Sequence, residues 1–223
     1  MGGCDHVDRV VGDPNLLTRT DAAVRSIREL GARTVGEAGL DLEAERSHAV
    51  HETLNPGVYC GGLTVAPNAF VTLNPGVYVM KNGPLFVELG GRLEGDGVGF
   101  YLTGTDAVFL FSADSKISLG APTTGPLAGL LFFEDRAAPL GRRHAIFSDD
   151  ARRLLGTFYL PRGELAVSTI FPVADQSDYT AIIAQKLTLF GGPMLTLNTD
   201  YHLSSVPTPE GVGAVGGRVF LRE

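Results

Sequence analysis

The sequence contains no tryptophan, and lysine supplies only three of its 18 basic residues. Basic residues never follow one another for more than two positions, as at Arg142-Arg143 and Arg152-Arg153, and the formal net charge is −7. Proteins that bind a nucleic-acid backbone need clustered positive charge. The charge pattern therefore argues against nucleic acid as a partner.

Long hydrophobic runs are missing as well. No stretch of 18 or more apolar residues occurs, so the sequence predicts no membrane-spanning helix. The first residues, Met1-Gly2-Gly3-Cys4, lack the apolar region that precedes the cleavage site of a signal peptide or a lipoprotein. We therefore expect neither a membrane span nor an export signal in this chain.

Cysteine is scarce, and its spacing suggests no metal site. Cys4 and Cys60 form no CxxC pair and have no histidine pattern beside them that would suggest zinc. From the residues alone, they could pair as one disulfide or remain as two buried thiols. The sequence motifs of serine hydrolases, zinc peptidases and P-loop proteins are also absent. We expect no catalytic, cofactor-binding or metal-binding residues.

Glycine and proline are frequent, and one hexapeptide is repeated. Leu-Asn-Pro-Gly-Val-Tyr occurs at 54–59 and again at 73–78, offset by 19 residues. Proline fixes φ, glycine tolerates positive φ, and Val-Tyr favours a strand, so each copy predicts a corner followed by a strand. A repeat of this length indicates a solenoid or array. The predicted turn residues are Asn55, Pro56, Gly57, Asn74, Pro75 and Gly76.

The two copies also match in the tyrosine that closes each of them. Tyr59 and Tyr78 occupy equivalent positions, as do Asn55 and Asn74. Stacked asparagines and stacked aromatic rings stabilise coiled β architectures. We therefore expect a structural role for these residues rather than sugar binding by the tyrosines.

From Leu54 onward, short apolar stretches alternate with turn signals every few residues, such as Gly90-Gly91 and Gly191-Gly192-Pro193. Apolar runs such as 130–133 and 181–184 are typical of parallel strands buried on both faces. A meander sandwich would show clean alternation and Asn-Gly hairpins instead. We predict an all-β fold, a right-handed parallel β-helix spanning residues 54–223. The expected strands are 63–65, 71–73, 77–79, 85–88, 98–102, 107–111, 116–119, 127–133, 144–147, 154–160, 164–168, 180–184, 186–189 and 194–198.

Residues 1–53 are predicted to form a separate, charged and partly helical segment. A short strand is expected near 4–11, and Thr20 or Asp21 could cap a helix that ends at Gly31. A weaker helical pattern near 40–50 would place His48 and His51 on one face. Because the sequence offers no third ligand, we interpret the two histidines as solvated rather than as a metal pair.

Basic side chains surround two acidic pairs. The acidic pairs are Glu134-Asp135 and Asp149-Asp150, and the basic residues are Arg136, Arg142, Arg143 and His144. Polysaccharide lyases and hydrolases with a β-helix fold place acidic groups from successive coils in an outward groove. Glu134-Asp135 follows two apparent core phenylalanines in a loop-like segment, so we interpret the cluster as ion pairing of Asp135 with Arg136 or Arg142. An enzyme is the alternative, and it requires carboxylates from adjacent coils to point into one groove.

From Leu54 to Arg222, the chain resembles the C-terminal region of TadG-like proteins of bacterial tight-adherence (Flp-type) pilus assembly. The motifs that carry the resemblance occur in the expected order. They are LNPGVYCGG (54–62), LNPGVYV (73–79), GDGVGFYLTG (95–104), APTTGPLAGLLFFEDR (121–136), GTFYLPRGEL (156–165), YTAIIAQKLTLFG (179–191) and LNTDY (197–201). Members of that family usually carry an upstream membrane anchor that holds the rest of the chain outside the cytoplasm.

The resemblance implies a location and a system rather than a chemical activity. It implies a periplasmic or cell-surface module with partners among other pilus-assembly or envelope components. Because cysteines normally pair in such compartments, it also implies a disulfide between Cys4 and Cys60. We therefore expect a non-enzymatic structural or adhesion module. The alternatives are a carbohydrate-active β-helix enzyme and a surface module that binds polysaccharide.

Overall fold

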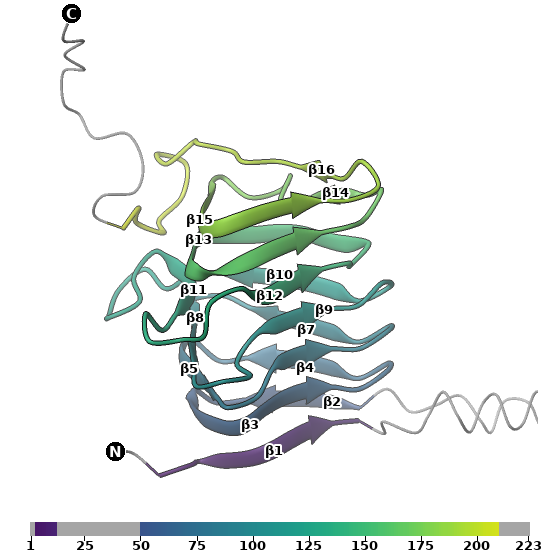
Figure 1. Cartoon of the computed structure of the whole chain (residues 1–223), viewed down its shortest axis with the longest axis vertical. Coiled ribbons are helices and arrows are strands. Elements are labelled where there is room, and N and C mark those ends of the chain that lie inside the picture. The colour runs from purple at the N-terminus through teal and green to yellow at the C-terminus, as the bar shows by residue number, and fades with distance from the viewer. Residues whose placement is uncertain (1–2, 13–49, 210–223) are drawn as a thin grey trace, which may run out of the picture.

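The structure is a computed structural model that describes residues 3–12 and 50–209. These residues form a parallel β-solenoid, which confirms the predicted fold class (Figure 1). Strands at the front of Figure 1 run opposite to those behind as the chain rises, in a right-handed coil. The strands are β1 (His6–Val11), β2 (His51–Leu54), β3 (Gly57–Val65), β4 (Phe70–Leu73), β5 (Gly76–Lys81), β6 (Leu85–Val87), β7 (Arg92–Gly95), β8 (Val98–Thr103), β9 (Phe109–Phe111), β10 (Lys116–Gly120), β11 (Leu130–Glu134), β12 (Arg142–Ile146), β13 (Asp150–Val167), β14 (Pro172–Val173), β15 (Thr180–Leu189) and β16 (Met194–Leu195).

The coil has three faces, and each strand pairs in parallel with the strand one coil away. The first face contains β2, β4, β7, β10 and the start of β13. The second face contains the start of β3, then β5, β8, β11 and the middle of β13. The third face contains the end of β3, then β6, β9, β12 and the end of β13. β15 covers β13 along the second and third faces.

The repeated hexapeptide forms two stacked corners, as its turn residues predict. Leu54 pairs with Leu73, and the Nδ2 of Asn74 donates to the Oδ1 of Asn55 at 2.8 Å. Gly76 has φ +145°, and a Cβ at this position would lie 2.6 Å from the ring of Pro56. Glycine is therefore required here both by its backbone conformation and by the close approach of the neighbouring corner.

The two tyrosines that close the hexapeptides are fully buried and lie over one another. Their ring centroids are 5.8 Å apart, and β3 and β5 are parallel neighbours, as predicted. Each hydroxyl turns back to a carbonyl of its own corner, and that of Tyr78 also reaches the corner of the neighbouring coil. The hydroxyl of Tyr59 donates to the carbonyl of Asn55, and that of Tyr78 donates to the carbonyls of Asn74 and Leu54. The tyrosines are thus structural, with no face open to a sugar.

Inward-facing side chains stack from coil to coil and make the core. On the second face, Tyr78, Phe100, Phe132 and Phe158 follow one another, with neighbouring ring centroids 4.9 to 5.7 Å apart. Each such aromatic side chain buries on the order of 150–250 Å². These inward stacks therefore supply a large part of the apolar burial that stabilises the fold.

The solenoid begins before Leu54, because β1 and β2 already belong to it. The helices expected within residues 13–49, and His48 with them, lie outside the described residues. His51 is on β2, where its ring meets the edge of the Phe70 ring. Three short strands, β2, β7 and β14, were not predicted, because each is only two to four residues long and lies near glycine or proline.

Cys4 and Cys60 form a disulfide, with their Cα atoms 5.7 Å apart. The bond fastens the start of β1 to β3, its parallel neighbour. Asp5 adds a second link, since its carboxylate accepts from the backbone N–H of Val58 at 2.7 Å. None of the described residues belongs to a helix long and apolar enough to cross a membrane.

Candidate functional site

Three of the charged or titratable residues singled out in the sequence, Glu134, Arg142 and His144, are buried in the solenoid rather than exposed in a loop. Along β11, Phe132 points inward and is fully buried, Phe133 packs outward against Tyr159, and Glu134 points inward again with no exposed surface. Glu134 pairs with Leu102 of β8, which pairs with Met80 of β5. A carboxylate therefore occupies a position that the preceding coils fill with apolar side chains.

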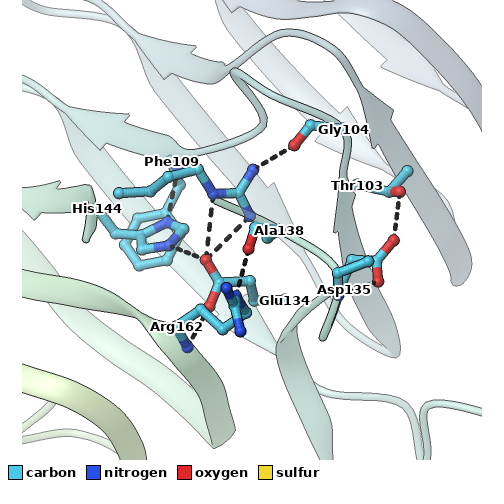
Figure 2. Close-up of polar contacts among 10 residues, drawn as sticks. Thr103, Gly104, Phe109, Glu134, Asp135, Ala138, His144 and Arg162 are labelled. Atoms are coloured by element: carbon cyan, nitrogen blue, oxygen red, sulfur yellow. Dashed lines mark hydrogen bonds and ion pairs between the residues drawn. The ribbon is translucent and has the colours of Figure 1, made fainter. Parts of the chain in front are cut away.

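His144 takes the equivalent position on the third face. It pairs with Leu165 and stacks on Phe109, with ring centroids 4.7 Å apart, and it has no exposed surface. Its Nε2 lies 3.4 Å from the Oε1 of Glu134 (Figure 2). The backbone N–H of Phe109 points at its Nδ1 at 3.3 Å. Since an N–H can only donate, Nδ1 is the acceptor, and the neutral ring carries its proton on Nε2 toward Glu134.

Two arginines complete this buried cluster of Glu134, Arg142, His144 and Arg162. The guanidinium of Arg142 donates to the Oε1 of Glu134 through Nη2 at 2.9 Å and Nε at 3.2 Å, and its Nη1 donates to the carbonyl of Gly104 at 2.7 Å. The backbone N–H of Arg162 donates to the Oε2 of Glu134 at 2.9 Å, and its side chain donates to the carbonyl of Ala138. The cluster thus joins three coils where the loop 135–141 leaves the solenoid (Figure 2).

The cluster keeps Glu134 ionised. Burial alone raises the pKa of Glu134, but hydrogen bonds from His144, from the backbone of Arg162 and from Arg142 outweigh it, so the pKa lies below its usual value. Burial also lowers the pKa of His144, and the attraction of Glu134 offsets this only in part. The resting state is therefore a carboxylate paired with an arginine beside a neutral imidazole.

The predicted pairing of Asp135 was wrong. The guanidinium of Arg142 points to Glu134, while Asp135 accepts from the hydroxyl of Thr103 at 2.7 Å and from the backbone N–H of Ala137 at 2.9 Å. Arg136 lies over the ring of Tyr159, 5.6 Å from its centroid. The prediction failed because Glu134 was taken for a loop residue. The alternation of Phe132, Phe133 and Glu134 would have placed it inward.

A second group of charges lines an open groove of about 410 Å³ where the third face turns into the first. Asp114 comes from one corner, and Asp149 and Asp150 come from the corner of the next coil. Asp149 accepts from the hydroxyl of Thr169 at 3.0 Å, and the Nζ of Lys116 lies 4.0 Å from Asp150. The groove therefore meets the requirement stated above for the enzyme alternative, carboxylates from adjacent coils facing one space.

The two sites differ in what they can do chemically. Within the buried cluster, Glu134 and His144 have no exposed surface, and Gly163 shows how tightly they are packed, since a Cβ there would lie 2.7 Å from the Nε2 of His144. No substrate can reach Glu134, so its role is to hold backbone groups of neighbouring coils. The groove is open and could contact a ligand. Among the described residues, no three His, Cys, Asp or Glu side chains are grouped so that they could hold a metal ion.

Comparisons of the chain with protein-family models, with curated proteins and with solved structures found no match.

Proposed function

We propose that the chain is a non-enzymatic structural or adhesion module of the bacterial cell envelope, associated with tight-adherence pilus assembly. The observation that supports the non-enzymatic part is the burial of the charged cluster at Glu134, while the groove at Asp149 and Asp150 supports the second candidate given below. Its carboxylate, imidazole and guanidinium groups satisfy one another and the backbone of three coils, with no access for a substrate. The association with pili comes from the resemblance to TadG-like proteins over residues 54–222.

An extracytoplasmic location is part of the proposal. The disulfide between Cys4 and Cys60 supports it, because structural disulfides persist in the periplasm and at the cell surface, whereas the cytoplasm reduces them. In such a place, the solenoid would act as a rigid body between the envelope and its partners, which we expect among other pilus-assembly or envelope components. Nucleic acid is not among the expected partners.

The experiment uses the host bacterium. Deleting the gene should reduce surface pili and attachment to a solid surface, and a copy with an epitope tag should restore both and fractionate with the periplasm or the cell surface. Thiol labelling of the fractionated protein should leave Cys4 and Cys60 unmodified until a reductant is added. A cytoplasmic protein with two free thiols, or a deletion strain with normal pili and attachment, would contradict the proposal.

The groove at Asp149 and Asp150 favours one second candidate, a carbohydrate-active or polysaccharide-binding module. Carboxylates from adjacent coils face the same space, and Phe171 at its side offers a ring on which a sugar could stack. The test is release of reducing ends from envelope polysaccharides, together with pull-down on the same insoluble polysaccharides. Activity or binding that is lost in Asp149→Asn with Asp150→Asn, but kept in Asp106→Asn at an exposed turn outside the groove, would favour this candidate.

A further inference from the structure

The last coil of the solenoid leaves apolar side chains uncovered. β15 pairs with β13 along one edge, and from Ala181 onward no strand in the described part of the chain pairs with its other edge. Leu187 and Leu189 stack on the buried Leu165 and Val167, yet they are 42% and 49% exposed, and no strand within residues 190–209 pairs above them. This end is the upper one in Figure 1, at β15 and β16. Within the described residues, an unpaired strand edge and exposed apolar side chains therefore meet at the same place.

The opposite end of the solenoid is closed differently. There β1 places His6 over Tyr59, with ring centroids 4.3 Å apart, and places Arg9 in the stack that continues through Leu63. Arg9 forms an ion pair with Glu52 of β2. The inward positions of the first coil are thus partly polar, which suits contact with water. A polar outer coil is the usual way in which a solenoid ends in solution.

We propose that the β15 end is a self-association surface, on which a second copy of this chain docks end to end through the same surface. A long apolar edge strand is a template for pairing with another strand, and a two-fold axis across this end lets each copy supply the edge that the other lacks. Leucines then meet leucines, and the core continues from one copy into the next. This proposal does not depend on the proposed pilus function.

The β15 end is apolar and the β1 end is partly polar, which favours a two-fold contact between two β15 ends over a head-to-tail stack. Head-to-tail contact would press Leu187 and Leu189 of one copy against Arg9 and Glu52 of the next. Burying that ion pair costs desolvation that an apolar surface cannot return. The two-fold contact avoids this cost and leaves the polar ends pointing outward. The assembly therefore closes as a dimer and does not grow into a filament.

Charge and area are both compatible with a dimer. The charge on β15 is Lys186, whose Nζ reaches back to Glu164 of the coil below at 3.4 Å, so it does not oppose the approach of a second copy. A contact limited to one edge strand per copy is small for a specific interface, which buries about 1,000 Å² or more in total. The dimer should therefore dissociate at low concentration.

The test is sedimentation equilibrium of the full, oxidised chain from micromolar to hundreds of micromolar concentration. We expect a monomer–dimer equilibrium, with twice the chain mass as the upper limit. Leu187→Asp and Leu189→Asp, prepared separately, should each weaken dimerisation at least tenfold. The matched control is Leu140→Asp, which alters an exposed leucine on the loop 135–141 and should leave the equilibrium unchanged.

Several results would overturn the proposal. A wild-type chain that stays monomeric over the whole range would do so, and no variant is needed to see it. Assemblies that keep growing with concentration would point to head-to-tail contacts. A dimer that survives both leucine substitutions in correctly folded protein would place the interface elsewhere. If either variant fails to fold, the melting temperature of the wild-type chain decides, because a dimer at this end makes it rise with concentration.

Discussion

The corners of the repeated hexapeptide and the corner beside Glu134 solve the same problem in different ways. At both places the chain turns sharply, and backbone groups lose their partners in the parallel ladder. Two neutral hydroxyls suffice at the hexapeptides, where Tyr59 and Tyr78 bind the carbonyls of Asn55, Asn74 and Leu54. At the other corner, the side chains of Arg142 and His144 and the backbone N–H of Arg162 gather around the carboxylate of Glu134.

The difference follows from how much chain leaves the coil. Leu54 and Leu73 are one coil apart and separated by 19 residues, whereas Leu119 and Leu154 are one coil apart and separated by 35. The longer coil contains the loop 135–141. Backbone groups at Gly104, Phe109, Ala138 and Arg162 then need side-chain partners from other coils. Where a loop interrupts the coil, a buried ionic cluster supplies the hydrogen-bond partners that the backbone lacks. In a regular coil, the hydroxyl of a stacked tyrosine supplies them.

The largest difference in stability between the two corners is expected for a substitution at Glu134. Glu134→Ala leaves the guanidinium of Arg142 buried without a counter-charge and the N–H of Arg162 without an acceptor. We expect the free energy of unfolding in urea to fall by about 3–5 kcal/mol. Glu94→Ala, at a partly exposed ion pair with Arg92, is the control and should cost less than about 1 kcal/mol. Equal losses of unfolding free energy in the two variants would mean that the buried cluster stabilises the fold no more than an exposed ion pair does.

Replacing the cluster by apolar side chains tests whether the cluster stabilises the fold by hydrogen bonding to buried backbone groups. Replacing Glu134, Arg142 and His144 together by Leu, Met and Phe gives positions 134 and 144 the residue types of the preceding coil and places an apolar side chain at position 142. Buried ion clusters replaced in this way often become neutral or stabilising. Here the N–H groups of Phe109 and Arg162 would stay buried without acceptors, so we expect a loss of about 2–4 kcal/mol. A triple variant as stable as the wild type in urea unfolding would show that the charges are dispensable.

The two corners should also differ in their response to pH. The pKa of His144 is lowered by burial, so the unfolded chain binds its proton first, and stability falls as pH drops below about 6.5. The pKa of Glu134 is lowered as well, so its contribution, present above about 4.3, is lost as pH falls further.

Urea unfolding measured between pH 8 and pH 5 separates the contribution of His144 to stability from that of Glu134. We expect a slope of up to about 1.4 kcal/mol per pH unit below the unfolded pKa of His144. His144→Gln should reduce that slope, while His202→Gln, at an exposed turn, should leave it unchanged. A wild-type chain with constant stability over this range would contradict a buried neutral His144.

The smallest expected effect is at the regular corner. Tyr78→Phe keeps the stacked ring but removes the hydroxyl that donates to Leu54 and Asn74. Because neutral hydrogen bonds contribute modestly, we expect a loss of about 1 kcal/mol in urea unfolding. A loss as large as that of Glu134→Ala would remove the distinction between the two corners.

The sequence predicts the regular corner better than the interrupted one for a physical reason. The hexapeptide carries its own turn residues, strand residues and closing tyrosine within six positions, so local rules identify it. The buried cluster draws Gly104, Glu134, Arg142 and Arg162 from three coils, and no local pattern connects them. Alternation along β11 and β12 could have placed Glu134 and His144 inward. Their partners, and the groove at Asp149, required the stacking of the coils.

The disulfide at the first coil has a consequence for mechanical load. The two ends of the described chain lie at opposite ends of the stack, so tension between them crosses the hydrogen-bonded interfaces in series, and the weakest opens first (Figure 1). Force entering at Cys4 passes through the covalent bond to Cys60 and bypasses the pairing of β1 with β3. The first coil is therefore protected from peeling under tension at its N-terminal end, and the first rupture is shifted toward the far end of the solenoid.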